Sequence, residues 1–217
     1  MAPAQAREIV TGLTDRDVVN RRFAWHVRAL HLTHFADPEP IAELLAEHLP
    51  ERFEDLRIPL TVAATNMGAP SPYAQYFFRG ARVRSAVLAS LSIPGVWPYV
   101  AIEGIPHADG GLTDAVVVPS ELETFDEFYV INVERRRESY RKRDRNIISR
   151  LWGAVEILAD TDVRDTRERI GGFDNVHWLD LDMGSASCLD FDHGLIESAR
   201  TRTLRWLADT DMGRRTR

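Results

Sequence analysis

The chain has 217 residues, a length that suits one globular domain with its own hydrophobic core. Apolar residues make up 44% of it and charged residues 28%, which argues against a globally disordered chain. The formal net charge of −6 argues against general nucleic-acid binding, and the single Cys188 excludes an internal disulfide or a cysteine-rich zinc site. No apolar run approaches the ~20 residues of a membrane span, and no signal-peptide pattern opens the chain, so we expect a cytoplasmic protein.

Helical and strand patterns alternate along the sequence. The first ~35 residues have helical spacing, and Asp37-Pro38 predicts the start of a helix with Asp37 as its N-cap. The apolar run 58–64 predicts a buried strand of the kind found at the centre of parallel sheets. The elements expected after it are strands over 73–78, 97–102, 128–133 and 176–181, and helices over 82–91, 146–159 and 194–207.

This alternation predicts an α/β fold with a mostly parallel sheet. The sequence contains no internal repeat and no low-complexity linker, so we expect a single domain over residues 1–217.

The candidate site is the turn Asp109-Gly110-Gly111, which follows a short apolar stretch. A carboxylate on a tight glycine turn at a strand end can reach a hydroxyl group directly, which suits a general base. Asp-Gly is also an ordinary turn signal, so the turn by itself does not distinguish the two interpretations.

Five sequence blocks that stand in order around this turn decide between them. The blocks are Ala63-Ala64-Thr65-Asn66, Phe77-Phe78-Arg79-Gly80, residues 86–95 (Ala-Val-Leu-Ala-Ser-Leu-Ser-Ile-Pro-Gly), Asp109-Gly110-Gly111 and Val118-Pro119. Over residues 56–119 they give the chain a clear resemblance to the patatin-like phospholipase family.

The resemblance implies a three-layer fold, with helices on both faces of the sheet, and hydrolysis of lipid acyl esters by a Ser-Asp dyad without a cofactor. It makes Asp109 the general base, and Gly110 and Gly111 the residues that shape its turn. The family places its nucleophile in a Gly-x-Ser-x-Gly elbow, preceded by a glycine-rich oxyanion loop. This sequence contains neither.

We therefore expect an N-terminally incomplete patatin domain that carries only the Asp half of the dyad and is inactive alone. Such a chain would expose unpaired strand edges. Two alternatives stay open: an inactive family member that acts as a lipid-binding or interaction module, and a serine hydrolase with an unrecognised nucleophile.

Other candidate sites have weaker patterns. Ser185 and Ser187 come nearest to an elbow, but no second glycine follows them and they come after Asp109. A Ser-His-Asp triad would pair Asp109 with His177 or His193, yet no serine before Asp109 lies in an elbow. A metal site at His31 and His34 would need a further ligand, so we expect none.

The densest basic stretch is a candidate contact with anionic lipid headgroups. It contains Arg135, Arg136, Arg137, Arg141, Lys142 and Arg143. The interleaved acidic residues Glu134, Glu138 and Asp144 weaken this interpretation, and a solvated loop is the simpler one.

Overall fold

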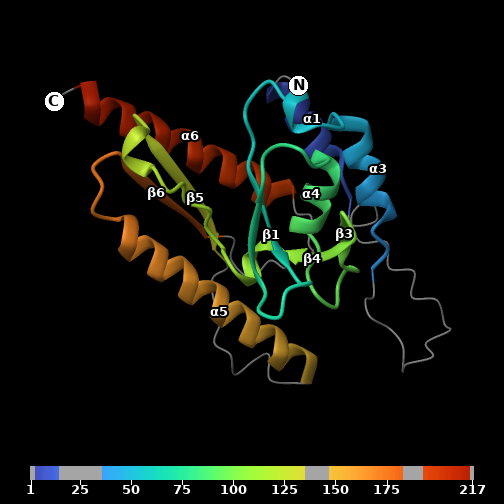
Figure 1. The fold of residues 1–217 in the computed structure, drawn as a ribbon. Coiled ribbons are helices and arrows are strands. Elements are labelled where there is room, and N and C mark those ends of the chain that lie inside the picture. Colours follow the sequence, from blue (N-terminus) through green and yellow to red (C-terminus); the bar gives the residue numbers. More distant parts are fainter. Residues whose placement is uncertain (1–2, 15–35, 135–146, 183–192, 216–217) are drawn as a thin grey trace.

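The computed structural model describes residues 3–14, 36–134, 147–182 and 193–215. It contains both helices and strands, and the strands form one four-stranded and one two-stranded sheet (Figure 1). The predicted α/β class is confirmed.

The four-stranded sheet has the order β2-β1-β4-β3, and every neighbouring pair in it is antiparallel. Its strands are β1 (Val62–Asn66), β2 (Tyr73–Phe77), β3 (Val100–Ile102) and β4 (Ile105–Asp109). The expectation of a mostly parallel sheet is wrong for these strands. β1–β2 and β3–β4 are joined by short connections, and parallel neighbours need a crossover of a dozen or more residues.

The central strand β1 begins later than expected. All five of its residues are buried, whereas Ile58, in the apolar run that predicted it, is 79% exposed. Pro59 has no backbone N–H to give to a ladder, which explains why the run does not pair from its first residue.

A hairpin between β3 and β4 replaces the single strand expected over 97–102. Its two-residue loop is Glu103-Gly104, and both residues have positive φ, 52° and 81°. These angles are typical of a type I′ turn, whose twist matches that of the two strands it joins. The hairpin makes β4 a separate strand that ends at Asp109.

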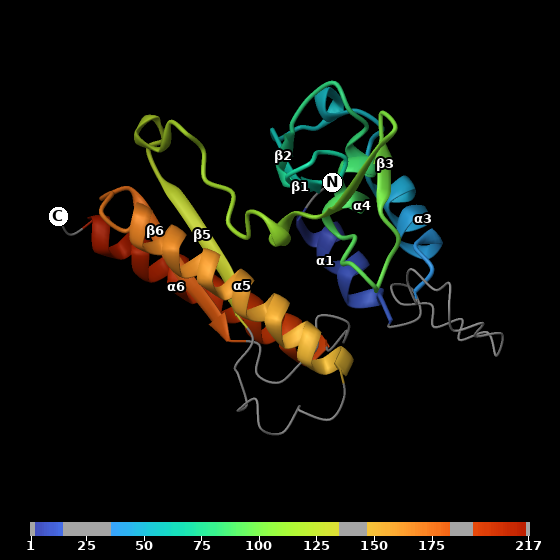
Figure 2. The ribbon, with the colours of Figure 1, turned by 60° about the horizontal axis from the view of Figure 1, so that its bottom comes forward.

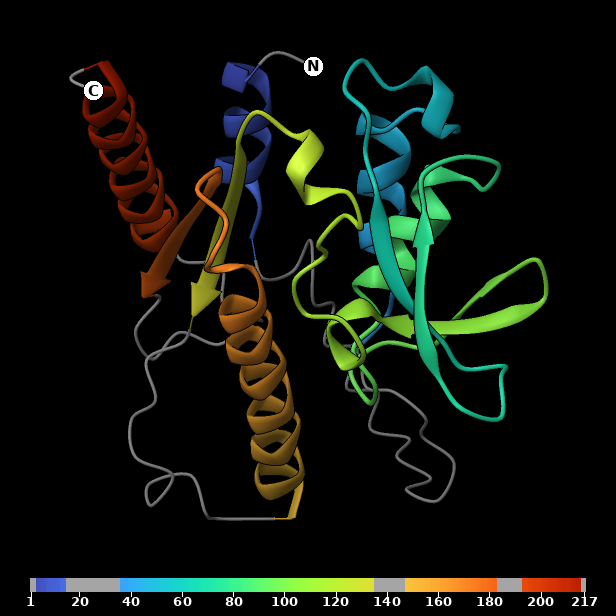
Figure 3. The ribbon, with the colours of Figure 1, turned by 60° about the vertical axis from the view of Figure 1, so that its left-hand side comes forward.

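The second sheet pairs β5 (Phe128–Glu134) with β6 (Val176–Asp182), in parallel over seven residue pairs. The crossover between them contains α5 (Ile147–Ile170), as a parallel pair requires. In Figure 2 the segment after β4 crosses from the four-stranded sheet to β5. Figure 3 shows both strands between α5 and α6 (His193–Arg215), and both helices run further than the sequence pattern predicted.

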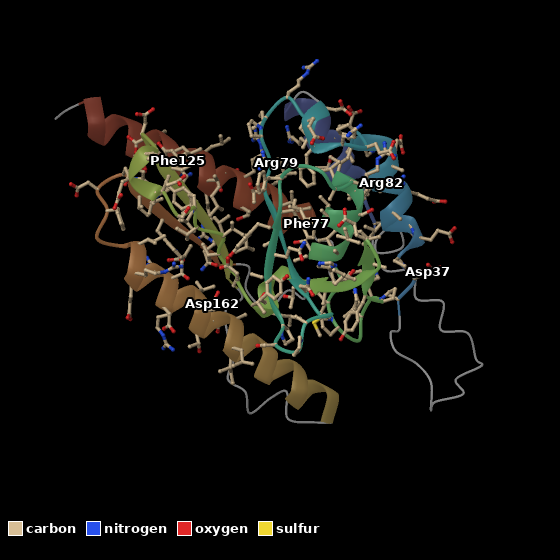
Figure 4. The ribbon with its side chains drawn as sticks, viewed as in Figure 1. Asp37, Phe77, Arg79, Arg82, Phe125 and Asp162 are labelled. Atoms are coloured by element: carbon tan, nitrogen blue, oxygen red, sulfur yellow. The ribbon has the colours of Figure 1, made fainter. Side chains whose placement is uncertain are left out.

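The helix α4 (Val83–Ser90) covers one face of the four-stranded sheet and lies within the range predicted for it. Val83, Ala86 and Ala89 on its inner side are fully buried. They pack in one cluster with Phe77, which Figure 4 labels, and with Ala64 of β1. The small side chains let the helix approach the strands closely, which places the loop after α4 next to the end of β4.

Two helices precede the sheet in sequence, α1 (Pro3–Gly12) and α3 (Glu39–His48). The helix predicted to start at Asp37-Pro38 is present, but Asp37 is not its N-cap: Pro38 holds that position, and α3 begins at Glu39. Asp37 lies one residue earlier, where its Oδ1 accepts a hydrogen bond of 3.0 Å from the Glu39 N–H. The helical spacing expected over the first ~35 residues is confirmed for α1, and residues 15–35 lie outside the described chain.

Candidate functional site

Asp109 is the last residue of β4 and caps a 3₁₀ turn, η2 (Gly110–Leu112). Its Oδ1 accepts a hydrogen bond of 2.7 Å from the Gly111 N–H. The other carboxyl oxygen, Oδ2, has no hydrogen-bond partner in the part of the chain that the structure describes, and Asp109 as a residue is only partly buried. One oxygen is therefore fixed, and the other has no partner among these residues.

The surroundings of Asp109 make its carboxyl group a stronger base. Burial raises the pKa of Asp109 above its ordinary value, and the hydrogen bond from the Gly111 N–H opposes this with a smaller effect. A carboxylate with a raised pKa takes up a proton more readily, as a general base must.

The backbone of Asp109 is held on both sides. Its N–H donates to the Ser92 carbonyl oxygen at 3.0 Å, and its carbonyl oxygen accepts from Thr65 Oγ1 at 2.7 Å. Across the sheet Asp109 pairs with Ala64, which is fully buried. Three separate segments, β1, β4 and the loop after α4, therefore fix the position of this residue.

Gly110 is required by close packing against β1. A Cβ atom at this position would lie 2.5 Å from the Ala63 carbonyl oxygen, a distance that real Cβ contacts essentially never show. At Gly111 a Cβ atom would lie 3.2 Å from Asp109 Oδ1, which is tight but less severe. The two glycines let the turn lie against the strand with Oδ1 in place.

Three of the five sequence blocks meet at Asp109. Thr65 belongs to the first block, Ser92 to the block over 86–95, and Gly110 to the turn itself. Sequence reasoning recognised these blocks by their order but assigned no contact to Thr65 or Ser92. Their signal in the sequence was that each is a hydroxyl residue within a mostly apolar stretch.

A buried polar network beside the site was also missed. His107, two residues before Asp109 on β4, is 1% exposed. Its Nδ1 lies 2.9 Å from the Ile105 carbonyl oxygen and its Nε2 lies 3.1 Å from Gln75 Oε1. Gln75 Oε1 also accepts from Asn66 Nδ2 at 2.8 Å. These bonds tie β1, β2 and β4 together next to the turn.

The alternative histidines lie elsewhere. His177 is on β6, where its Nε2 lies 2.6 Å from Glu127 Oε2, and His193 is the first residue of α6.

Ser85 and Ser90 are part of α4, and Ser92 Oγ donates to the Leu88 carbonyl oxygen at 2.7 Å. Several other candidates lie outside the described residues: Ser185, Ser187, His31, His34 and the basic stretch over 135–143.

Other features of the described residues are separate from Asp109. An open hollow of about 610 Å³ lies between α1 and α3, and none of the residues that hold Asp109 lines it. No group of three or more His, Cys, Asp or Glu side chains is placed to hold a metal ion within the described ranges. Among the described helices, none is both long and apolar enough to cross a membrane.

The family assignment follows from comparison with known proteins. The model of the patatin-like phospholipase family matches residues 1–122, which is more than half of the chain. The chain belongs to this family. The patatin match includes the four-stranded sheet, α4 and the Asp109 turn, and it ends before β5. No curated protein matches the chain.

Membership of the patatin-like family indicates hydrolysis of lipid acyl esters as the class of activity. The blocks that gave the resemblance in the sequence fall inside the matched range.

Proposed function

We propose that this patatin-like chain supplies the general base of a Ser-Asp dyad that hydrolyses lipid acyl esters, and that Asp109 is this base. The observation that carries the proposal is the asymmetry of its carboxyl group. Oδ1 is fixed by the Gly111 N–H, whereas Oδ2 has no partner among the described residues. Burial also raises the pKa of Asp109, which strengthens it as a proton acceptor.

In the proposed reaction the serine Oγ attacks the ester carbonyl carbon while its proton passes to Asp109 Oδ2. The tetrahedral intermediate collapses, the ester C–O bond breaks, and the leaving alkoxide takes the proton from Oδ2. Asp109 then accepts a proton from water, and the resulting hydroxide attacks the acyl-serine. Protonation of the serine Oγ by Asp109 releases the fatty acid and restores both groups.

The nucleophile is the part of this proposal that the sequence does not supply. No Gly-x-Ser-x-Gly motif occurs in the 217 residues. We propose that these residues carry the Asp half of the dyad alone and that the chain by itself does not turn over acyl esters.

Complementation tests the role of Asp109. The chain is mixed with a separate fragment of a patatin-like enzyme that carries the glycine-rich loop and the serine elbow, and ester hydrolysis is measured. We expect activity only in the mixture, and a loss of about 10²–10⁴-fold in the mixture with Asp109→Asn. Asp126→Asn, at an exposed position, is the matched control and should leave the activity unchanged.

Hydrolysis by the chain alone would contradict the proposed absence of a nucleophile. If that activity survived Asp109→Asn, it would contradict the dyad as well. Labelling of the chain by a fluorophosphonate probe, followed by mapping of the labelled serine, would then support the third interpretation, a hydrolase with an unrecognised nucleophile.

A second candidate function is lipid binding without catalysis, which the absence of an elbow motif favours. We propose the basic residues over 135–143 as its contact with anionic headgroups, because polybasic segments are attracted to such surfaces. Binding to vesicles with and without an anionic lipid should then fall with salt and with the triple change Arg135→Ala, Arg136→Ala and Arg137→Ala. Equal binding to neutral vesicles would contradict this contact.

A further inference from the structure

The hydroxyl groups of Thr65 and Thr113 lie 2.8 Å apart, and Thr65 Oγ1 also lies 2.7 Å from the Asp109 carbonyl oxygen. Thr65 is on β1 and is 1% exposed, and Thr113 directly follows the 3₁₀ turn η2. Two hydroxyl groups that are distant in sequence are therefore linked to each other, and one of them is linked to the backbone of Asp109.

The direction of these bonds follows from the number of protons. A carbonyl oxygen only accepts, so the single hydroxyl proton of Thr65 must point to the Asp109 carbonyl. The contact between the two hydroxyls must then use the proton of Thr113. The chain of donors runs from Thr113 to Thr65 to the Asp109 carbonyl oxygen, and each bond polarises the next.

This hydrogen-bond chain complements the bond on the other side of Asp109. There the Asp109 N–H donates to the Ser92 carbonyl oxygen at 3.0 Å. The peptide groups before and after the Cα atom of Asp109 are thus both held, which fixes the direction of its Cβ and the 2.7 Å contact between Oδ1 and the Gly111 N–H. A small displacement of a catalytic group can cost about 10²-fold in rate.

We infer that Thr65 is a positioning residue for Asp109, and that Thr113 acts through it by fixing the direction of the Thr65 hydroxyl. The inference rests on the proposed role of Asp109 for its functional meaning. Its physical content, the control of the Asp109 turn by two hydroxyl groups, can be measured without any hydrolysis. If the catalytic proposal fails, this measurement still shows whether the two hydroxyl groups hold the Asp109 turn.

The test compares Thr65→Val, which keeps the shape and removes the hydroxyl, with Thr65→Ser, which keeps the hydroxyl. NMR measures hydrogen exchange of the Gly111 amide and its proton shift as Asp109 titrates. In Thr65→Val we expect exchange at Gly111 to accelerate by about tenfold, with Val130 in the other sheet unchanged, and the titration-dependent shift to shrink. Thr65→Ser should behave as the unmodified chain.

Equal exchange in Thr65→Val and the unmodified chain would overturn the inference. It would also be overturned if Thr65→Ser were as impaired as Thr65→Val, because the methyl group and not the hydroxyl would then matter. Should Thr65→Val fail to fold, Thr113→Val decides. It removes only the first donor, so we expect a smaller acceleration of about threefold at Gly111, restored in Thr113→Ser. No acceleration in Thr113→Val would overturn the inference that the two hydroxyls hold the Asp109 turn.

Discussion

The backbone N–H of Asp109 donates to the carbonyl oxygen of Ser92 at 3.0 Å. This bond joins the end of β4 to the loop that follows α4, across 17 residues of sequence. It explains why the block over 86–95 accompanies the Asp-Gly-Gly turn. The buried alanines of that block bring α4 close to the sheet, and the loop after the helix then reaches the candidate base.

Replacing Gly110 with alanine should destabilise the fold strongly. The new Cβ would meet the Ala63 carbonyl oxygen at 2.5 Å, and neither backbone can move away without breaking the β1–β4 pairing. We expect the free energy of unfolding, measured by urea titration, to fall by about 2–3 kcal/mol. Gly172→Ala is the matched control, because its Cβ would meet nothing within 4 Å and should change stability by less than about 0.5 kcal/mol. Equal losses in the two variants would contradict the packing argument.

Replacing Asp109 with asparagine should stabilise the chain at neutral pH. Burial raises the pKa of Asp109, so between the ordinary and the raised value the folded state binds more protons than the unfolded state. The free energy of unfolding of the unmodified chain therefore falls as the pH rises through that interval. Asparagine keeps an oxygen for the Gly111 N–H and carries no charge.

Urea unfolding from acid to neutral pH measures this effect. The stability difference between Asp109→Asn and the unmodified chain should be small in acid and should grow as the pH rises. Asp126→Asn, at an exposed position, should show no such trend. A difference for Asp109→Asn that does not depend on pH would show that the burial of the charge is not its cause.

The carboxylate of Asp180 should stabilise the two-stranded sheet. Burial acts to raise the pKa of Asp180, but hydrogen bonds from Asn132, Trp178 and Arg167 outweigh it and lower the pKa overall. The Arg167 Nη1 to Asp180 Oδ2 distance is 2.7 Å, and the Trp178 Nε1 to Oδ1 distance is 2.6 Å. We expect Asp180→Asn to cost about 1–2 kcal/mol of unfolding free energy at neutral pH.

The stabilisation by the Asp180 carboxylate should depend on pH. Because the pKa of Asp180 is lowered on folding, its contribution is present above the ordinary carboxyl pKa of about 4 and is lost as the pH falls through the lowered value. Thermal unfolding followed by circular dichroism should show the two chains converging in acid. Asp174→Asn, at an exposed turn, is the matched control. An undiminished difference in acid would contradict the role of the charge.

Tyr76 should ionise at a higher pH than an ordinary tyrosine because it donates a hydrogen bond to Asp114 Oδ2. This bond is the main cause that raises the pKa of Tyr76 to about 12, followed by burial. Between pH about 10 and about 12 the folded chain keeps a proton that the unfolded chain loses, so unfolding free energy should fall with rising pH in this window. In Tyr76→Phe this fall in the free energy of unfolding between pH about 10 and about 12 should be absent. At neutral pH the same variant should have a free energy of unfolding about 1 kcal/mol lower than that of the unmodified chain.

Ultraviolet absorption of the tyrosinate measures the same group directly. One tyrosine of the unmodified chain should ionise near pH 12, and Asp114→Asn should shift it toward 10. A titration curve that Asp114→Asn leaves unchanged would show that the hydrogen bond does not control Tyr76.

The elements that local pattern determines were predicted from the sequence. Helix α4, the start of α3 and strands β2, β5 and β6 fall where spacing, the Asp37-Pro38 pair and apolar runs placed them, although the N-cap of α3 is Pro38 and not Asp37. The hairpin loop Glu103-Gly104 was missed, although its glycine was a signal, because the apolar residues before it were assigned to one strand that led directly to the turn. The antiparallel direction of the strands in the four-stranded sheet was also missed, because strand direction depends on the length of each connection.

The sequence by itself determined the family and the identity of the candidate base, because both depend on residue types in a fixed order. Ala-Ser-x-Ser-x-Pro-Gly followed by Asp-Gly-Gly can be recognised without coordinates. Only the tertiary structure decided how that base is held. Thr65, Ser92 and Ala63 come from segments that are distant in sequence, and their contacts with the turn exist only once β1, β4 and α4 have packed. Burial, which makes the Asp109 carboxyl group more basic, is likewise a property of the packed chain and not of the turn.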